Sequence, residues 1–166
     1  MTVHHVAVPL HSALHKPMFH DVTVEAQRAL AASGIRAGTL TVYSQHTTCS
    51  VIIQEASHDR TLDGTEFLLQ DMLDRLEQLV PICRHEGQYL HPGPQHIAHA
   101  SGTLGEEAWW SLNTDAHIRS AIVGRSETIP VTDGVLELGE FGRIYFVDFD
   151  ATRPRDRNVH FSVIGE

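Results

Sequence analysis

Three short segments of this chain carry side chains that could bind an anion or a metal ion. In the first, Gln45-His46-Thr47-Thr48 joins two strand-like apolar runs, where Gly, Pro or Asn would be the usual turn residues. The hydroxyls of Thr47 and Thr48 either bond back to the local chain or bind an anion beside exposed backbone N–H groups. His46 is likewise either a surface turn histidine or one wall of a pocket, and the sequence leaves both interpretations open.

Asn113 and His117 form the second segment. Their i, i+4 spacing places both side chains on one face of a helix predicted to begin here. Asn113 is either the cap of that helix or a ligand contact, because its side chain suits both roles. His117 precedes Ile118, so it is either a half-buried histidine bonded to the backbone or a functional imidazole.

The third segment carries three arginines within five residues, Arg153, Arg155 and Arg157. Acidic residues flank them, so an exposed turn with weak local ion pairs would account for the pattern. Guanidinium groups are also the usual grip on phosphate oxygens. Because the whole chain carries a net charge of -9, this basic cluster is a candidate site for a small phosphorylated ligand.

The chain contains 13 histidines, and histidine is the commonest metal-binding side chain. His85 follows a predicted helix, and His96 with His99 forms an HxxH pair on a Gly- and Pro-rich stretch. The sequence has neither an HExxH nor a CxxC motif, so no spacing rule by itself identifies a metal site. We interpret Cys49 as a small residue packed at the start of a strand, with a nucleophile as the alternative.

The elements that must position these residues are antiparallel strands and helices. Short turns between consecutive strands, such as Asp133-Gly134, predict hairpin pairing, so the expected fold class is α+β. Residues 87–107 lack periodicity and predict a long loop or insertion. The pattern predicts strands at 3–10, 39–44, 50–53, 127–131, 135–138, 143–149 and 159–164, and helices at 18–33, 62–80 and 114–123.

Length and charge bound the class of protein. A chain of 166 residues predicts a single domain spanning 1–166 with a sizeable core. The net charge of -9 argues against binding to nucleic acid or to anionic membranes, and no apolar run is long enough to cross a bilayer. The first residues lack the features of a signal peptide, and only two cysteines are present. We therefore expect a cytoplasmic protein in a reducing compartment.

Several runs together resemble the YjbQ-like family, whose members are described as secondary thiamine-phosphate synthases. The run QHTTCSVIIQE (45–55) resembles that family's QHT(S/T)ASL signature, which ends in NE. NTDAHIRSAIVG (113–124) is similar to its NAHxH segment and the helix that follows. IPVTDG (129–134), LGEFGRI (138–144) and DFDATRPRDRNVHFSVIGE (148–166) match further family motifs in the same order. The resemblance covers nearly the whole chain.

The resemblance implies a compact α+β fold that assembles as a homotrimer, with sites near the subunit boundaries. It also implies that His46, His85 and His117 gather in one pocket, with Glu55 and Asn113 nearby. His85 is placed where the family has an aromatic-x-His run after its long helix. Three imidazoles with an open position would suit zinc, and magnesium is the other divalent ion considered.

The implied activity joins a hydroxymethylpyrimidine diphosphate to a thiazole phosphate and releases pyrophosphate. His46, Glu55, Asn113 and His117 are then the candidate catalytic residues. The candidate phosphate-binding residues are Thr47, Thr48, Arg153, Arg155 and Arg157. Two alternatives remain: a metal-dependent hydrolase that uses a metal-bound water with Glu55 as base, and a non-catalytic trimer that binds a ligand or a metal.

The sequence also departs from the family pattern around the expected pocket. Such changes bear on substrate preference more than on the histidines themselves. The departures are Gln54 for Asn, Asp115 for the additional histidine of NAHxH, Phe141-Gly142 for Trp-Gln, Asp148 for Glu, and an insertion at about 87–110.

Overall fold

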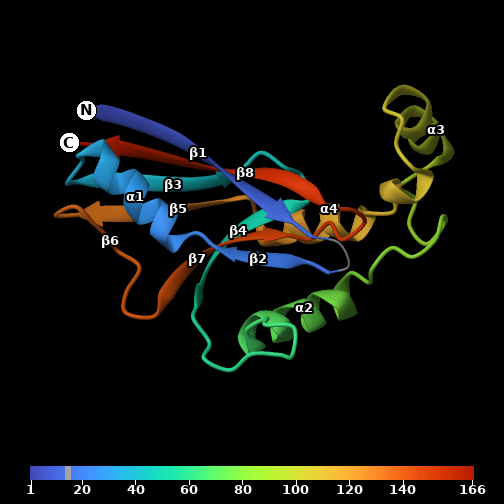
Figure 1. The fold of residues 1–166 in the computed structure, drawn as a ribbon, viewed down its shortest axis with the longest axis horizontal. Coiled ribbons are helices and arrows are strands. Elements are labelled where there is room, and N and C mark those ends of the chain that lie inside the picture. The colour runs from blue at the N-terminus through green and yellow to red at the C-terminus, as the bar shows by residue number, and fades with distance from the viewer. Residues whose placement is uncertain (14–15) are drawn as a thin grey trace.

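The computed structural model describes residues 1–13 and 16–166, which form helices packed on two antiparallel sheets (Figure 1). The prediction of an α+β fold is confirmed. The elements, in chain order, are β1 (Thr2–Ser12), β2 (Met18–Asp21), α1 (Thr23–Ser33), β3 (Gly38–Ser44), β4 (Cys49–Glu55), α2 (Phe67–Leu79), α3 (Pro94–Thr103), the 3₁₀ helix η1 (Ala108–Ser111), α4 (Thr114–Val123), β5 (Ser126–Thr132), β6 (Val135–Leu136), β7 (Gly142–Asp148) and β8 (Arg155–Gly165).

The larger sheet has the strand order β1-β8-β3-β5-β6, and the smaller one has the order β2-β7-β4. The β5–β6 hairpin turns at Asp133 and Gly134, whose φ angles of 53° and 79° are those that a tight primed turn requires. Pairing of β3 with β8 brings the chain after Ser44 beside the arginine-bearing start of β8. Pairing of β4 with β7 sets Cys49 opposite Asp148.

Strand β7 is buried on both faces, so its alternate side chains enter two different cores. Ile144 and Phe146 point into a core formed between the two sheets and α1. Tyr145 and Val147 point the other way, into a core shared with α2 and α4. The smaller sheet therefore lies in the middle of the molecule, with α2 and α4 packed against the face that is turned away from the larger sheet (Figure 1).

The first helix begins later than the sequence predicts. Residues 18–21 form β2, which pairs with β7 from Met18 opposite Asp148 to Asp21 opposite Tyr145. Asp21 Oδ1 then accepts a hydrogen bond from Thr23 N–H at 2.9 Å, and α1 starts there. The prediction of helix over all of 18–33 is wrong in its first turn, because strand pairing outweighs a weak helical periodicity.

The second helix also begins late. Thr61 Oγ1 and Asp63 Oδ1 both accept the Thr65 N–H, which closes a turn and delays α2 until Phe67. Leu62, expected on the apolar stripe of the helix, is fully exposed in this turn. The predicted helix start at residue 62 is therefore wrong.

The predicted loop at 87–107 contains a helix, α3, with Pro94 in its first turn. Of the residues in α3 only Ala100 is buried, so the segment lacks the apolar stripe that would reveal a helix in the sequence. Figure 1 shows α3 projecting from the body of the molecule. In the described part of the chain, no helix has the length and apolarity that a membrane crossing needs.

Candidate functional site

The His-Thr-Thr turn, the start of α4 and the start of β8 surround one cavity of about 350 Å³. Strand pairing explains this, because it places the β3–β4 turn next to Arg157 and the end of β7. Seven of the predicted site residues share the cavity, together with Gln45 and Asp150. The seven are His46, Thr47, Thr48, Asn113, His117, Arg155 and Arg157.

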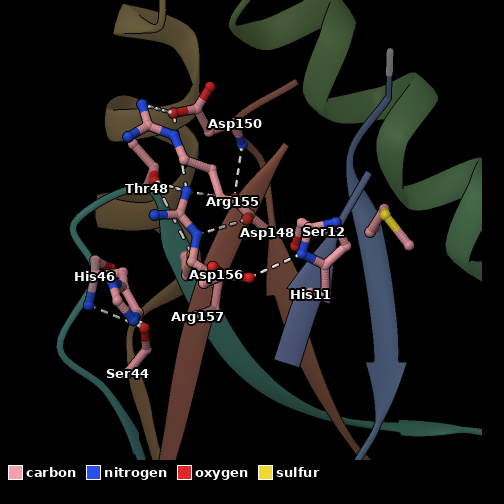
Figure 2. Close-up of polar contacts among 12 residues, drawn as sticks. His11, Ser12, Ser44, His46, Thr48, Asp148, Asp150, Arg155, Asp156 and Arg157 are labelled. Atoms are coloured by element: carbon pink, nitrogen blue, oxygen red, sulfur yellow. Dashed lines mark hydrogen bonds and ion pairs between the residues drawn. The ribbon is translucent and has the colours of Figure 1, made fainter. Parts of the chain in front are cut away.

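Arg157 is held by a buried bidentate ion pair with Asp148 (Figure 2). Its Nε donates to Asp148 Oδ2 at 2.7 Å and its Nη2 donates to Asp148 Oδ1 at 3.1 Å. The same Nη2 lies 3.1 Å from Thr48 Oγ1. Burial disfavours the charge of Arg157, but the hydrogen bonds and charge of Asp148 outweigh it and raise the pKa of Arg157. Within the described residues these bonds leave Nη1 for a ligand.

Asp150 links the arginine segment to α4. Its Oδ2 accepts Arg155 Nη2 at 2.9 Å and Asn113 Nδ2 at 3.2 Å, and its Oδ1 accepts the hydroxyl of Thr152 at 2.6 Å. Burial would raise the pKa of Asp150, yet these donors outweigh burial and hold the pKa below its usual value. The side chain of Asn113 does not cap α4. Of its two predicted roles, the structure therefore favours the site contact.

His46 has a defined tautomer. Its Nε2 accepts a hydrogen bond from the Asn158 backbone N–H at 3.0 Å, so a neutral ring carries its proton on Nδ1. Burial, followed by the charge of Arg157, lowers the pKa of His46. Ser44 Oγ accepts the His46 backbone N–H at 3.2 Å and fixes the turn (Figure 2). His46 is therefore a neutral hydrogen-bond donor in a pocket wall, and not a loose surface residue.

His117 is half-buried on α4, and burial lowers its pKa, partly opposed by the charge of Asp150. Its ring meets His91 edge-on at 5.8 Å between centroids, and His91 in turn lies 4.6 Å from His96. His91 Nδ1 is 2.8 Å from Thr114 Oγ1, which fixes the ring. The sequence reasoning missed His91. The signal was present, because Tyr89-Leu90-His91 is an aromatic-x-His run, whereas residue 83, two before His85, is a cysteine.

Two predicted residues that should share a pocket with His46, namely His85 and Glu55, lie outside this cavity. His85 is exposed, with its Nδ1 3.0 Å from the Glu86 carbonyl. Glu55 ends β4 opposite Gly142, at the other end of the strand from the His-Thr-Thr turn. The prediction that both share a pocket with His46 is wrong for a single chain. His85 lies in the segment after α2, and the length of β4 separates Glu55 from the His-Thr-Thr turn.

Arg153 also lies apart from the cavity lining. It pairs with Glu106 and stacks on Trp110, with its guanidinium carbon 4.1 Å from the ring centroid. These contacts attach η1 and the residues before it to the arginine segment. Of the three predicted phosphate-binding arginines, Arg155 and Arg157 line the cavity and Arg153 holds the neighbouring segment.

The predicted zinc ligands do not fit a three-histidine site. His46 uses Nε2 as the acceptor for Asn158, and His85 lies outside the cavity. Over residues 1–13 and 16–166, no group of three or more His, Cys, Asp or Glu side chains has the geometry to hold a metal ion. The donor set of His46, His85 and His117 within one chain therefore supports no resident metal.

Cys49 is fully buried beneath the site, and burial followed by the charge of Asp148 raises the pKa of its thiol. A thiol that stays protonated and lies out of reach of solvent is a poor nucleophile. The interpretation of Cys49 as a packed small residue is confirmed.

The chain is similar to proteins of one family along almost its whole length. The family model described as UPF0047 protein YjbQ-like matches residues 11–166. A UPF0047 protein of Methanothermobacter thermautotrophicus is 30% identical over 166 residues, which is 100% of this chain and 95% of that protein. The UPF0047 protein YugU of Bacillus subtilis is 30% identical over 145 residues, or 87% of this chain and 88% of YugU.

Solved structures agree with this likeness. A hypothetical protein of Aeropyrum pernix superposes with a TM-score of 0.71 at 28% identity and covers 100% of both chains. An uncharacterised YjbQ/UPF0047 protein of Clostridium acetobutylicum gives a TM-score of 0.70 at 26% identity, over 96% of this chain and 99% of the other.

Proposed function

The chain belongs to the YjbQ-like UPF0047 family, and from this premise we propose that it is a transferase acting on a small phosphorylated substrate. The reaction we propose is thiamine-phosphate synthase-like, joining a hydroxymethylpyrimidine diphosphate to a thiazole phosphate. The observation that carries the proposal is the cavity in which Arg155, Arg157, His46 and His117 meet.

The cavity is preorganised for an anion. Both arginines are oriented by buried carboxylates, so their guanidinium groups do not need to be ordered when a ligand arrives. The Nδ1–H of His46 and the exposed hydroxyl of Thr47 add neutral donors at the same turn. Fixed donors of this kind stabilise charge that develops on a leaving diphosphate.

In the proposed step, the bond between the methylene carbon and the diphosphate oxygen breaks, and its electron pair leaves on pyrophosphate. The thiazole nitrogen supplies the lone pair for the new carbon–nitrogen bond. Arg155 and Arg157 hold the departing oxygens, and the neutral ring of His117 supplies a further hydrogen-bonding group in the cavity wall. The net charge of the Arg–Asp framework is zero, so we propose that magnesium enters bound to the diphosphate oxygens.

We also propose the homotrimer that the resemblance implies. Support comes from the outer face of the larger sheet, opposite α1, where Val3, Tyr43 and Ile164 are exposed. A sheet face that carries exposed apolar side chains among polar ones such as His5, Thr41 and His160 suits burial against another copy of the chain. Light scattering on the purified protein tests the assembly, and a monomeric mass would contradict it.

The function is tested by mixing the two phosphorylated reactants with the protein and magnesium and measuring pyrophosphate release. We expect release only when both reactants are present. Arg155→Gln should lower the rate at least about tenfold, because it removes a charge-assisted bond to the leaving group. The matched control is Arg36→Gln, an arginine whose side chain is 72% exposed and pairs with Asp133.

The other outcomes are equally informative. Phosphate or pyrophosphate release from the diphosphate ester alone would identify a hydrolase instead. Pyrophosphate binding by calorimetry without any turnover would identify a binding protein. Equal rates for Arg155→Gln and Arg36→Gln would overturn the role of the cavity.

A further inference from the structure

A second cavity of about 380 Å³ adjoins the phosphate cavity. The two cavities share two wall residues, Asn113 and Asp150, which are hydrogen-bonded to each other. The second cavity lies between residues 82–84 after α2, the start of α4, the segment after β7, and residues 16–17 before β2. A molecule that extends past Asn113 would therefore have one end in each cavity.

The walls of the second cavity combine apolar surface with an incompletely paired carboxylate. Leu112, Ala116 and Phe149 supply apolar surface. Asp115, only 5% exposed, also lines the cavity. Its Oδ1 accepts the Cys83 backbone N–H at 3.0 Å.

The other oxygen of Asp115 lacks a close donor among the described residues. Its Oδ2 lies 4.0 Å from Arg119 Nε, which is longer than a hydrogen bond. Arg119 directs that same Nε to the Val80 carbonyl at 3.1 Å and its Nη2 to Glu77 and Val80. A carboxylate oxygen that faces a cavity, on a residue only 5% exposed, favours a ligand that donates a hydrogen bond.

The charges near the second cavity disfavour an anion. Asp115 and Asp150 both line it, whereas Lys16 is paired with Asp63. Arg84, at the rim, is 71% exposed and directed toward Glu77. Phosphate therefore belongs in the first cavity, and the second suits an apolar ring with a donor at its edge.

We propose that the second cavity binds the ring of the substrate whose diphosphate occupies the first, and that Asp115 selects a planar ring bearing an amine or amidine N–H. This inference rests on the proposed function and adds a specificity-determining residue to it. The scissile carbon–oxygen bond then lies at the junction beside Asn113. Asp115 stands where the family pattern has a histidine, so the preference belongs to this chain's own sequence.

The experiment uses benzamidine as the ring with an N–H donor and benzoate as the same ring with an anion. We expect calorimetry to show binding of benzamidine and none of benzoate. Asp115→Asn should weaken benzamidine at least about tenfold, because it removes the charge from that hydrogen bond. The matched control Asp71→Asn, on the exposed side of α2, should leave the affinity unchanged.

Because Asp115 also contacts the Cys83 backbone, a second variant guards against misfolding. Ala151→Leu introduces bulk from a half-exposed position that lines only the second cavity and should abolish benzamidine binding. Pyrophosphate titration of both variants gives the folding control and should match the parent protein. Unchanged benzamidine affinity in both variants, or binding of benzoate as tight as that of benzamidine, would overturn the inference.

The pyrophosphate titration also separates this inference from the proposed function. If the parent protein binds pyrophosphate but not benzamidine, the result supports the first cavity as a phosphate site and contradicts the second cavity as a site for the ring. A parent protein that binds benzamidine but not pyrophosphate, even with magnesium, contradicts the proposed function and leaves the amine-selective cavity supported.

Discussion

Two regions contribute to the site in opposite ways. The strand-borne region comprises the His-Thr-Thr turn, the end of β7 and the start of β8, and its central ion pair, Asp148 with Arg157, is buried within the body of the fold. The segment-borne region, residues 87–111, projects from the body and brings His91 against His117 (Figure 1). The anion-binding groups are therefore fixed by sheet pairing, whereas the ring contact to His117 depends on a more weakly packed segment.

The largest effect on stability is expected from a substitution that breaks the buried ion pair of the strand-borne region. Asp148→Ala leaves the guanidinium of Arg157 buried without its bidentate partner. We expect the free energy of unfolding to fall by about 3–5 kcal/mol, measured by urea denaturation. The control Asp156→Ala removes a carboxylate that is 95% exposed and should change stability by less than about 1 kcal/mol. Similar values for the two variants would contradict a rigid framework.

The next effect concerns the segment-borne region. Trp110→Ala removes the ring on which Arg153 stacks and should cost about 1–2 kcal/mol locally. Hydrogen exchange should accelerate in α3 and η1 while the amides of β7 keep their protection. The neighbour Trp109, half-exposed, is the control. Equal acceleration in α3 and in β7 would show that the two regions do not differ.

Acidification should weaken the fold through its half-buried histidines. Burial lowers the pKa of His20, His46, His91 and His117 below the usual 6.5, so the unfolded chain takes up protons first as the pH falls. The free energy of unfolding should therefore be constant above about pH 7 and decrease as the pH drops through 6.5.

His46→Gln should flatten this pH dependence, measured by urea denaturation across the range. The exposed His99→Gln is the control and should retain the slope of the parent protein. An unchanged or steeper slope in His46→Gln would contradict a neutral, half-buried ring at His46.

The smallest effect stabilises the projecting helix. Gly102 lies inside α3, and a Cβ added there meets no atom within 4 Å. Gly102→Ala should stabilise α3 by about 0.5–1 kcal/mol, seen as slower hydrogen exchange in that helix. Gly105→Ala should instead destabilise the end of this segment, because Gly105 has a φ of +66° that a residue with a side chain disfavours.

The sequence predicted the strand-borne region well because its information is local. Period-two alternation located the strands, and the motif residues at their ends meet through ordinary antiparallel pairing. The expectation that His46, Thr48 and Arg157 share a site came from the family resemblance, because the pairing of β3 with β8 joins segments far apart in the sequence. Asp148, which orients Arg157, was noted only as a departure from the family pattern.

The segment-borne region could not be predicted in the same way. α3 buries a single alanine, so it has no periodic stripe to detect. His91 is held beside His117 by its contact with Thr114, a long-range pairing that leaves no periodic pattern. His85 and His91 both follow α2, so the sequence pattern alone does not distinguish one from the other as the neighbour of His117.

The burial of β7 on both faces has a consequence for redesign. A substitution anywhere in its middle disturbs two sets of packed neighbours together, so the strand has no neutral side on which variation can accumulate. New specificities are therefore best sought in the loops and on α4, while the strand that ends at Asp148 is kept as it stands.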